Sequence, residues 1–266
     1  MGLGELVRKL PFDHPYRWDG SLFGKPKLWT PAELTLKLWL DAYDEDTITE
    51  SGGAVSQWDD KSGEDNHATQ TTEADKPTTG SRLLNGYNVL DFEGIIGDYM
   101  DIDDLAFGDE HTIYMVAKYD TTGSYKDLLR DALAGATIEF GASNANFATF
   151  YGNGSSWDDT AANTPNQVVT SDVILGVVAD GVGGAIPYWN GTAQNSKVCS
   201  MPDKTGFSLN GRHPQNHDGY IAEVVIADTA LSTEDRQKLE GYLAWKWGLE
   251  GNLPSGHPYK SAPPTV

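Results

Sequence analysis

The strongest constraint on the fold is a series of short apolar runs, each as long as a β-strand, separated by turn dipeptides. In residues 36–40, leucine at every second position alternates with Lys37 and Trp39, which is the two-residue period of a strand. Further strand-like runs are residues 87–92, 112–119, 137–140, 147–151, 173–179, 185–189 and 220–227. The turn dipeptides, which tolerate positive φ angles, are Asn85-Gly86, Asp180-Gly181, Asn190-Gly191 and Asn210-Gly211. Many short strands joined by tight turns predict an all-β sandwich or barrel.

A single amphipathic helix is predicted near the C-terminal end. Ser232 is a suitable N-cap, with Asp235 three residues further on, and Gly248 can end the helix. Its apolar stripe consists of Leu239, Tyr242, Leu243 and Trp247. We expect this helix to cap one end or edge of the sandwich. Trp245 lies off the stripe and is expected to be partly exposed.

Composition and charge exclude several classes of protein. The 266 residues carry a formal net charge of −20, which would repel phosphate and so excludes a general nucleic-acid-binding role. Cys199 is the only cysteine, which excludes an internal disulfide framework and a Cys-rich zinc site. No stretch has the roughly 18 apolar residues of a membrane-spanning helix, and no export signal is recognisable. We therefore expect a protein that is made without export and contacts no membrane.

Residues 1–33 differ from the rest and contain one half of an internal repeat. Their prolines predict an extended arm. The repeat pairs Leu6, Leu10-Pro11 and His14-Pro15-Tyr16 with Leu249, Leu253-Pro254 and His257-Pro258-Tyr259 at identical spacing. Either the copies are the remnant of a tandem duplication, or both dock in similar grooves, one in its own subunit and one on a neighbour. In the second case the anchoring residues of the arm are Leu10, Pro11, His14, Pro15, Tyr16 and Trp18.

Three blocks of residues resemble a known family. The first block is Trp58-Asp59-Asp60-Lys61-Ser62-Gly63 followed by Asn66-His67-Ala68, and the second is Asp91-Phe92-Glu93-Gly94 with Asp98-Tyr99-Met100. The third block comprises Ile221-Ala222-Glu223-Val224, Ala230-Leu231-Ser232, Arg236, residues 241–249 (GYLAWKWGL) and His257-Pro258-Tyr259. Together they resemble laminin-G-like jelly-roll domains of the concanavalin A-like lectin/glucanase superfamily, above all the copies in bacteriophage virion proteins and bacterial surface proteins.

The resemblance implies an all-β fold: a two-sheet antiparallel jelly-roll sandwich that commonly binds glycans or proteins. It covers about residues 34–260, so the expected organisation is an arm (1–33), one jelly-roll domain (34–260) and a tail (261–266). The superfamily also contains glycosidases, so the resemblance alone does not decide between binding and catalysis.

The chain lacks the paired carboxylates that the glucanase branch carries on one strand. A retaining glycosidase needs two carboxylates roughly 5–5.5 Å apart. The strand-like runs hold only the isolated acids Asp91, Glu139 and Glu223, and strict alternation would give Glu223 the apolar Ile221 and Val225 as neighbours on its face. We therefore expect no enzymatic activity, while a second acid from another strand stays open.

An acidic cluster is the candidate metal site. Asp101, Asp103 and Asp104 are expected in a loop, and their carboxylates suit Ca²⁺, which prefers oxygen ligands. The alternative is a solvated acidic loop, because clusters also arise by composition in a chain with 39 acidic residues.

A tryptophan is the candidate sugar-binding residue. Trp157 lies in the polar, Gly-rich segment 152–159, where stacking on the apolar face of a sugar is plausible chemistry. Asn153 and Asp158 would supply hydrogen bonds. The alternative is that Trp157 covers a sandwich edge or fills a subunit interface. The tryptophans expected in the core are Trp58, Trp189 and Trp247.

Two functions of different classes fit these features. The first is a non-enzymatic bacteriophage virion protein, a capsid decoration (head-associated) protein. Residues 1–33 would hold it to a capsid or tail protein as a homo-oligomer, by analogy a trimer, and its jelly roll would face a host surface glycan. The second is a tail-associated adhesin or a bacterial glycan-binding or glycan-cleaving protein.

Overall fold

The computed structural model describes ten stretches of the chain. They are residues 27–94, 97–121, 126–131, 138–143, 146–152, 157–159, 170–182, 184–196, 204–210 and 217–266. For residues 126, 138–143, 146–152, 157–159 and 204 only the backbone is described.

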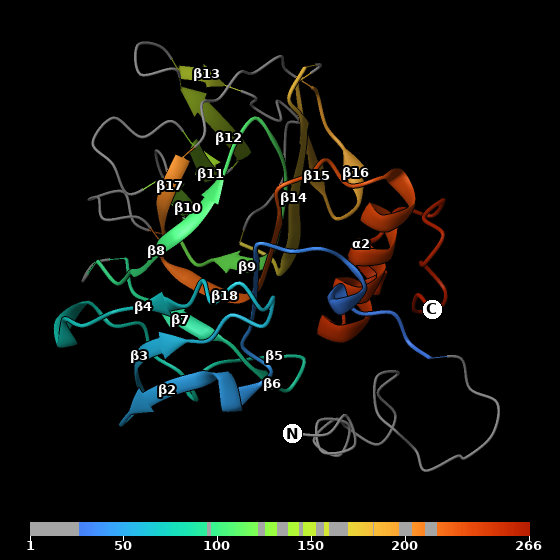
Figure 1. Ribbon diagram of the computed structural model, residues 1–266. Helices are drawn as coiled ribbons and strands as arrows, with labels where there is room; N and C mark the ends of the chain where they lie inside the picture. Colours follow the sequence, from blue (N-terminus) through green and yellow to red (C-terminus); the bar gives the residue numbers. More distant parts are fainter. Residues whose placement is uncertain are drawn as a thin grey trace.

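Two antiparallel sheets form the framework of the described chain (Figure 1). The seven-stranded sheet has the order β1-β18-β9-β14-β15-β16, with β7 also paired to β18. Its strands are β1 (Leu38–Asp41), β7 (Leu90–Phe92), β9 (Glu110–Tyr119), β14 (Val173–Asp180), β15 (Ala185–Trp189), β16 (Thr192–Ala193) and β18 (Gly219–Ala227). The predicted two-sheet antiparallel sandwich is therefore confirmed.

The second sheet has nine strands in the order β13-β12-β11-β10-β17-β8-β4-β3-β2. Its strands are β2 (Ile48–Ser51), β3 (Ala54–Trp58), β4 (Ala68–Thr69), β8 (Met100–Phe107), β10 (Lys126–Asp131), β11 (Ile138–Ser143), β12 (Asn146–Gly152), β13 (Trp157–Asp159) and β17 (Lys204–Leu209). A separate hairpin joins β5 (Leu83–Leu84) to β6 (Tyr87–Asn88). Short 3-10 turns lie at Pro31–Glu33, Glu45–Thr47, Glu73–Asp75 and Glu250–Asn252.

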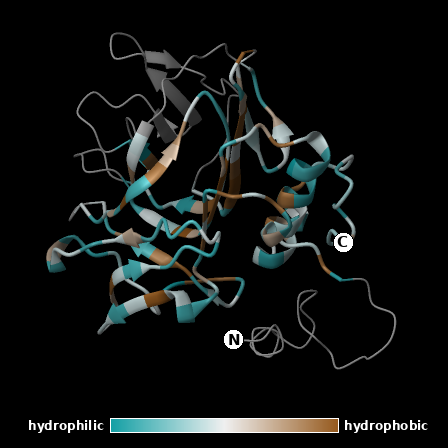
Figure 2. Ribbon diagram, viewed as in Figure 1, coloured by the Kyte–Doolittle hydropathy of each residue, from teal (hydrophilic) through white to brown (hydrophobic). Residues whose placement is uncertain are grey.

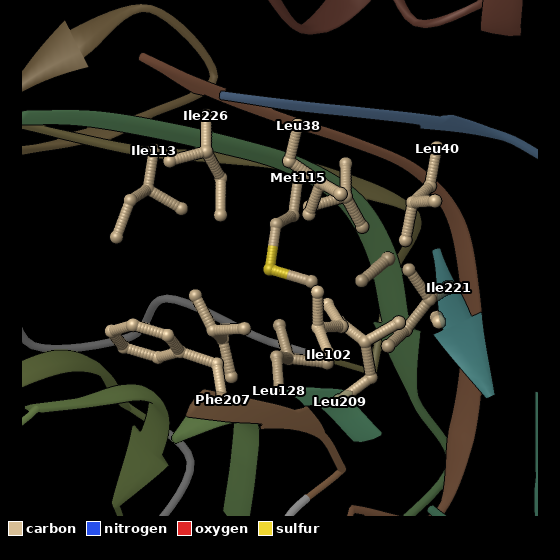
Figure 3. Close-up of a cluster of buried hydrophobic side chains, with 14 of the residues drawn as sticks. Leu38, Leu40, Ile102, Ile113, Met115, Leu128, Phe207, Leu209, Ile221 and Ile226 are labelled. Carbon is tan, nitrogen blue, oxygen red and sulfur yellow. The ribbon is translucent and has the colours of Figure 1, made fainter. Parts of the chain in front are cut away.

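The main core lies between the two sheets. Figure 3 shows Leu38, Met115 and Ile226 of the seven-stranded sheet facing Ile102 and Leu209 of the nine-stranded sheet. All five side chains are fully buried. Hydrophobic residues accordingly concentrate where the layers meet, and hydrophilic residues occupy the outer strands and loops (Figure 2). Burial of this apolar surface is the main force that holds the sheets together.

Helix α2 (Thr233–Trp247) forms a third layer on the outer face of the seven-stranded sheet. The Ser232 hydroxyl accepts a hydrogen bond from the Asp235 N–H, and Gly248 ends the helix with a φ of 71°. Both ends therefore match the prediction, and the predicted apolar stripe is buried against the sheet. Its position differs from the prediction, because α2 covers a face of the sandwich rather than an end or edge.

The two ends of the described chain lie together beside α2 (Figure 1). Leu28 forms a β-bridge with Thr265, and the Val266 N–H donates to the Lys27 carbonyl at 2.8 Å. Trp29 is buried and its ring meets Tyr242 of α2 edge-on. Residues 27–29 and 264–266, assigned above to an arm and a tail, thus contact the sandwich and each other.

Candidate functional site

The first motif block builds a polar loop that covers the free edge of β1. One carboxylate, Asp60, organises this loop: its Oδ1 accepts from the Trp39 and Ser62 backbone N–H groups, and its Oδ2 accepts from the Ser62 hydroxyl and the Asn66 N–H. The Asn66 side chain in turn donates to the Lys37 carbonyl at 2.8 Å. The acidic and polar residues of this block therefore satisfy the backbone of an edge strand.

The third motif block builds a buried ionic cluster between β1, β18 and α2. Glu223 on β18 is fully buried, and its two oxygens accept four hydrogen bonds. The donors are Trp39 Nε1 at 2.8 Å, Tyr242 Oη at 3.0 Å, Lys246 Nζ at 2.8 Å and Trp247 Nε1 at 2.7 Å. Such a set of donors is what a carboxylate needs to remain buried.

A second carboxylate stands directly across from Glu223. Asp41 on β1 is its register partner, and Lys246 lies between the two acids, 2.5 Å from Asp41 Oδ1 and 2.8 Å from Glu223 Oε2. Lys61 contacts the other oxygen of Asp41 at 2.8 Å. Burial alone would raise the pKa of Asp41, but the ammonium groups of Lys246 and Lys61 outweigh it and lower that pKa to about 2. Burial raises the pKa of Glu223, and Lys246 opposes this rise.

The expected neighbours of Glu223 are corrected by a bulge in β18. Residues 221 and 223 of β18 oppose the consecutive residues 117 and 116 of β9, so one extra residue of β18 is accommodated. After the bulge, Ile221 belongs to the core between the sheets, whereas Glu223 is on the α2 side with Val225. The sequence reasoning missed this cluster, although an Asp after an apolar strand and a Lys between two tryptophans are signals of buried charge.

A second buried ionic cluster centres on Glu240 of α2. Its Oε1 accepts from Arg236 Nη1 and from the Tyr114 hydroxyl, both at 2.6 Å. Its Oε2 lies 3.0 Å from His257 Nε2. Because His257 Nδ1 accepts from the Tyr259 N–H at 3.2 Å, Nε2 carries the proton and donates to Glu240. This cluster joins the sheet, the helix and the C-terminal copy of the repeat.

Neither cluster has the geometry of a hydrolytic site. Asp41 and Glu223 face each other, but they are 2% and 0% exposed and their oxygens are occupied by protein donors. A glycosidase needs its two carboxylates on either side of a bound sugar ring. A substrate cannot reach these acids unless α2 leaves the sheet. Their chemistry is therefore limited to groups of the chain itself.

The expected calcium residues lie on a strand rather than in a loop. Asp101, Asp103 and Asp104 all belong to β8, where a register shift in the pairing with β17 interrupts the alternation and exposes Asp103 and Asp104 together. Asp101 accepts from the Ser208 hydroxyl at 3.2 Å. Within the described residues, no group of three or more His, Cys, Asp or Glu side chains is placed to hold a metal ion.

The expected sugar-binding residues are placed in part. Trp157 and Asp158 lie in β13, the edge strand of the nine-stranded sheet, and not in a loop. Trp157 is the register partner of Gly152 and Asp158 that of Tyr151. Asn153 falls outside the described residues.

The remaining predictions concern the tryptophans and the arm. Trp58 and Trp247 are fully buried as predicted, whereas Trp189 is half-buried against the core. Trp245 is half-buried, in agreement with the prediction. The predicted anchoring residues, which lie outside the described residues, are Leu10, Pro11, His14, Pro15, Tyr16 and Trp18.

The C-terminal copy of the repeat shows what this motif does. Leu253 and His257 are buried, and the Tyr259 carbonyl accepts from Trp245 Nε1 at 2.8 Å. A Cβ atom placed on Gly241 would lie 2.6 Å from Tyr259 Cβ, so the glycine makes room for this ring. The motif thus docks against α2 through specific contacts.

The architecture defines the protein as a two-sheet antiparallel β-sandwich with one helix on the outer face of a sheet. No protein-family model matches the chain, and no curated protein matches its sequence. Among solved structures, it is similar to domain 4 of an extracellular arabinanase of Geobacillus stearothermophilus in complex with arabinotriose, with a TM-score of 0.60 and 15% identity. That alignment covers 77% of this chain and 98% of the arabinanase domain.

Two further similarities involve larger proteins. The binding domain of paraclostridial mosquitocidal protein 1 has a TM-score of 0.59 at 12% identity, over 78% of this chain and 52% of that one. The Trypanosoma rangeli sialidase in complex with sialic acid has a TM-score of 0.53 at 15% identity, over 84% of this chain and 36% of that one. At these identities the similarities establish the fold. Among the described residues, no helix is long and apolar enough to span a membrane.

Proposed function

We propose that this chain is a non-enzymatic module that binds a glycan at the β12–β13 edge of its nine-stranded sheet. The observation that carries the proposal is the shared fold with an arabinanase domain solved with arabinotriose, combined with the sealed acid pair under α2. Asp41 and Glu223, which face each other across β1 and β18, are closed to a substrate.

The chemistry of the β13 edge supports sugar recognition. Trp157, Asp158 and Asp159 are consecutive in an edge strand, next to the aromatic residues of β12. An aromatic ring offers a surface for the apolar face of a sugar, and carboxylates accept hydrogen bonds from sugar hydroxyls.

A glycan array followed by calorimetry with the best ligand tests this proposal. Trp157→Ala is expected to weaken binding about tenfold, equivalent to ~1.4 kcal/mol, because stacking is lost. Trp157→Phe is the matched control, since it keeps an aromatic face and is expected to retain most of the affinity. Unchanged affinity in Trp157→Ala would remove Trp157 from the site. A reducing-sugar assay on the same glycan is expected to show no turnover, and clear turnover would overturn the non-enzymatic assignment.

We further propose that the module is displayed on a bacteriophage particle, as a head-associated decoration protein held through residues 1–33. The support is the resemblance of the three motif blocks to phage copies of the domain and the net charge of −20, which suits an exposed surface. A mass-spectrometric inventory of purified particles, with electron microscopy to locate the protein on head or tail, tests this placement. Detection only in the bacterial cell envelope would favour the bacterial glycan-binding alternative.

A further inference from the structure

We propose that Lys246 and Asp41 become joined by an intramolecular amide (isopeptide) bond, which the folded protein forms by itself with Glu223 as the proton-transfer group. This inference is independent of the glycan-binding proposal, because it concerns only groups inside the fold. The three residues come from α2, β1 and β18, so folding of the sandwich is what brings them together.

Lys246 Nζ lies within hydrogen-bonding distance of both carboxylates. It lies 2.5 Å from Asp41 Oδ1. The same nitrogen lies 2.8 Å from Glu223 Oε2. A nucleophilic nitrogen, a carboxyl acceptor and a second carboxylate thus meet at one point, as in any acyl transfer assisted by a general base.

The three groups are shielded from water. The three side chains are buried, and aromatic rings enclose the ammonium group: Lys246 Nζ lies 5.6 Å from the ring centroid of Tyr43 and 5.2 Å from those of Tyr242 and Trp247. Exclusion of water removes a competing nucleophile from the reacting groups. It also protects an amide, once formed, from hydrolysis.

The bond forms in a balanced sequence of proton transfers. Glu223 relays a proton from the Lys246 ammonium group to the Asp41 carboxylate, which leaves a neutral amine beside a neutral carboxylic acid. The amine nitrogen attacks Cγ of Asp41 to form a C–N bond, and the pair of electrons of the C=O bond moves onto oxygen. The C–OH bond of the resulting tetrahedral centre then breaks, and the departing oxygen leaves with two protons, the one relayed by Glu223 and one from the attacking nitrogen. The products are an amide and one water molecule.

Lys61 supports this reaction as a positioning residue. Its ammonium group lies 2.8 Å from Asp41 Oδ2, the oxygen that Lys246 does not contact, and 2.9 Å from Asp44. A fixed positive charge at that oxygen stabilises the negative charge that develops there during attack. Lys61 is itself the less suitable nucleophile, because its side chain is 18% exposed whereas that of Lys246 is 5% exposed.

The consequence is a covalent link between the first strand and the last helix. The bond would close a loop that contains almost the whole sandwich, and such a link stabilises a fold by restricting its unfolded state. A module displayed on a surface would resist heat, proteases and mechanical pull even after its non-covalent contacts fail.

Intact-mass spectrometry of the purified full-length protein under denaturing conditions tests the proposal. The expected mass is lower than the sequence mass by one water molecule. Tryptic digestion is expected to leave the chain uncut after Lys246 and to yield a branched peptide that contains Asp41 and Lys246. A wild-type protein with its full sequence mass would overturn the proposal, whatever the variants show.

Two variants separate the proposed bond from other losses of water. Lys246→Arg keeps the charge but has no reactive amine, so it is expected to show its full mass. Water loss that persists in Lys246→Arg comes from another site and counts against the proposal. Glu223→Gln is expected to remain largely unlinked when its circular dichroism shows a folded protein, whereas linkage as complete as in the wild type would remove Glu223 from the reaction.

Discussion

At the scale of single residues, three acidic side chains of this fold are each held by several partners. Asp60, Glu223 and Glu240 each accept at least three hydrogen bonds. These three acids belong to a loop, to β18 and to α2, yet each one joins segments that are far apart in the sequence. Removal of one such acid leaves its donors buried and unpaired, which costs more than the hydrogen bonds contribute net. Specificity of packing here depends on polar residues as much as on apolar ones.

Gly241 tests the tightness of the docking between α2 and the C-terminal segment. Alanine normally stabilises a helix by about 1 kcal/mol relative to glycine. Gly241→Ala is nevertheless expected to lower the free energy of unfolding by about 1–3 kcal/mol, because its Cβ would lie 2.6 Å from Tyr259 Cβ. Gly251→Ala is the control, since a Cβ there meets nothing within 4 Å. Urea denaturation measures both variants, and equal stabilities would contradict the expectation.

Asp98 predicts a pH dependence of stability. Burial, with the nearby carboxylates of Glu93, Asp75 and Asp91, raises its pKa to about 6. Between about pH 4 and 6 the folded state therefore binds more protons than the unfolded state, so this group's contribution to stability falls as the pH rises. The asparagine of Asp98→Asn would stay neutral at every pH. The free energy of unfolding of Asp98→Asn is therefore expected to exceed that of the wild type by about 2–3 kcal/mol at pH 7 and to equal it near pH 4.

The control for Asp98 is an exposed aspartate on the neighbouring strand. Asp104→Asn on β8 is expected to leave the free energy of unfolding within about 0.5 kcal/mol of the wild type at both pH values. Chemical denaturation at pH 4 and pH 7 measures the free energies of unfolding of both variants and the wild type. If Asp98→Asn raises the free energy of unfolding equally at both pH values, protonation of Asp98 is not the cause of the increase.

At the scale of elements, strands with a regular apolar period could be predicted from the sequence. The effects of a bulge or register shift could not, and neither could the buried ionic clusters. The runs at 112–119, 173–179, 185–189 and 220–227 became β9, β14, β15 and β18 to within two residues at each end. Strand β8 was missed because its acids and its register shift break the apolar alternation. The bulge in β18 likewise changed the face on which Glu223 lies. The buried clusters combine residues up to 205 positions apart, which no local pattern contains.

Glu240 tests how α2 is held against the sheet. Its carboxylate is fully buried and neutralises Arg236 while accepting from Tyr114 and His257. Glu240→Gln is expected to cost about 3–5 kcal/mol, because it leaves the guanidinium buried without a countercharge. Glu234→Gln is the matched control on the same helix: its pair with Lys238 is exposed, so the variant is expected to unfold at nearly the wild-type temperature. Equal melting temperatures of the two variants in thermal unfolding would contradict a role of Glu240 in holding α2.

At the scale of the whole molecule, the fold has three layers, and the two ends of the described chain pair with each other beside α2. The nine-stranded sheet, the seven-stranded sheet and α2 stack in that order, and two hydrophobic clusters fill the spaces between them. The strand and turn pattern alone left a sandwich or a barrel open, and the family resemblance selected two antiparallel sheets. The position of α2 on a face was not predicted, because an amphipathic stripe indicates that a helix is buried but not against which surface.

The repeat carries the last prediction, which concerns assembly. Its C-terminal copy docks on α2 through Leu253, His257 and Tyr259, and residues 1–24 carry the same pattern of side chains. If the N-terminal copy uses this chemistry on a neighbouring subunit, deletion of residues 1–24 should lower the mass of the assembly measured by light scattering. The double substitution His14→Ala/Tyr16→Ala in the full-length chain should do the same, because it removes the matching contacts without shortening the arm. An unchanged mass in both would mean that the repeat is only the remnant of a duplication, whereas loss of assembly in the deletion alone would assign the contact to other residues of the arm.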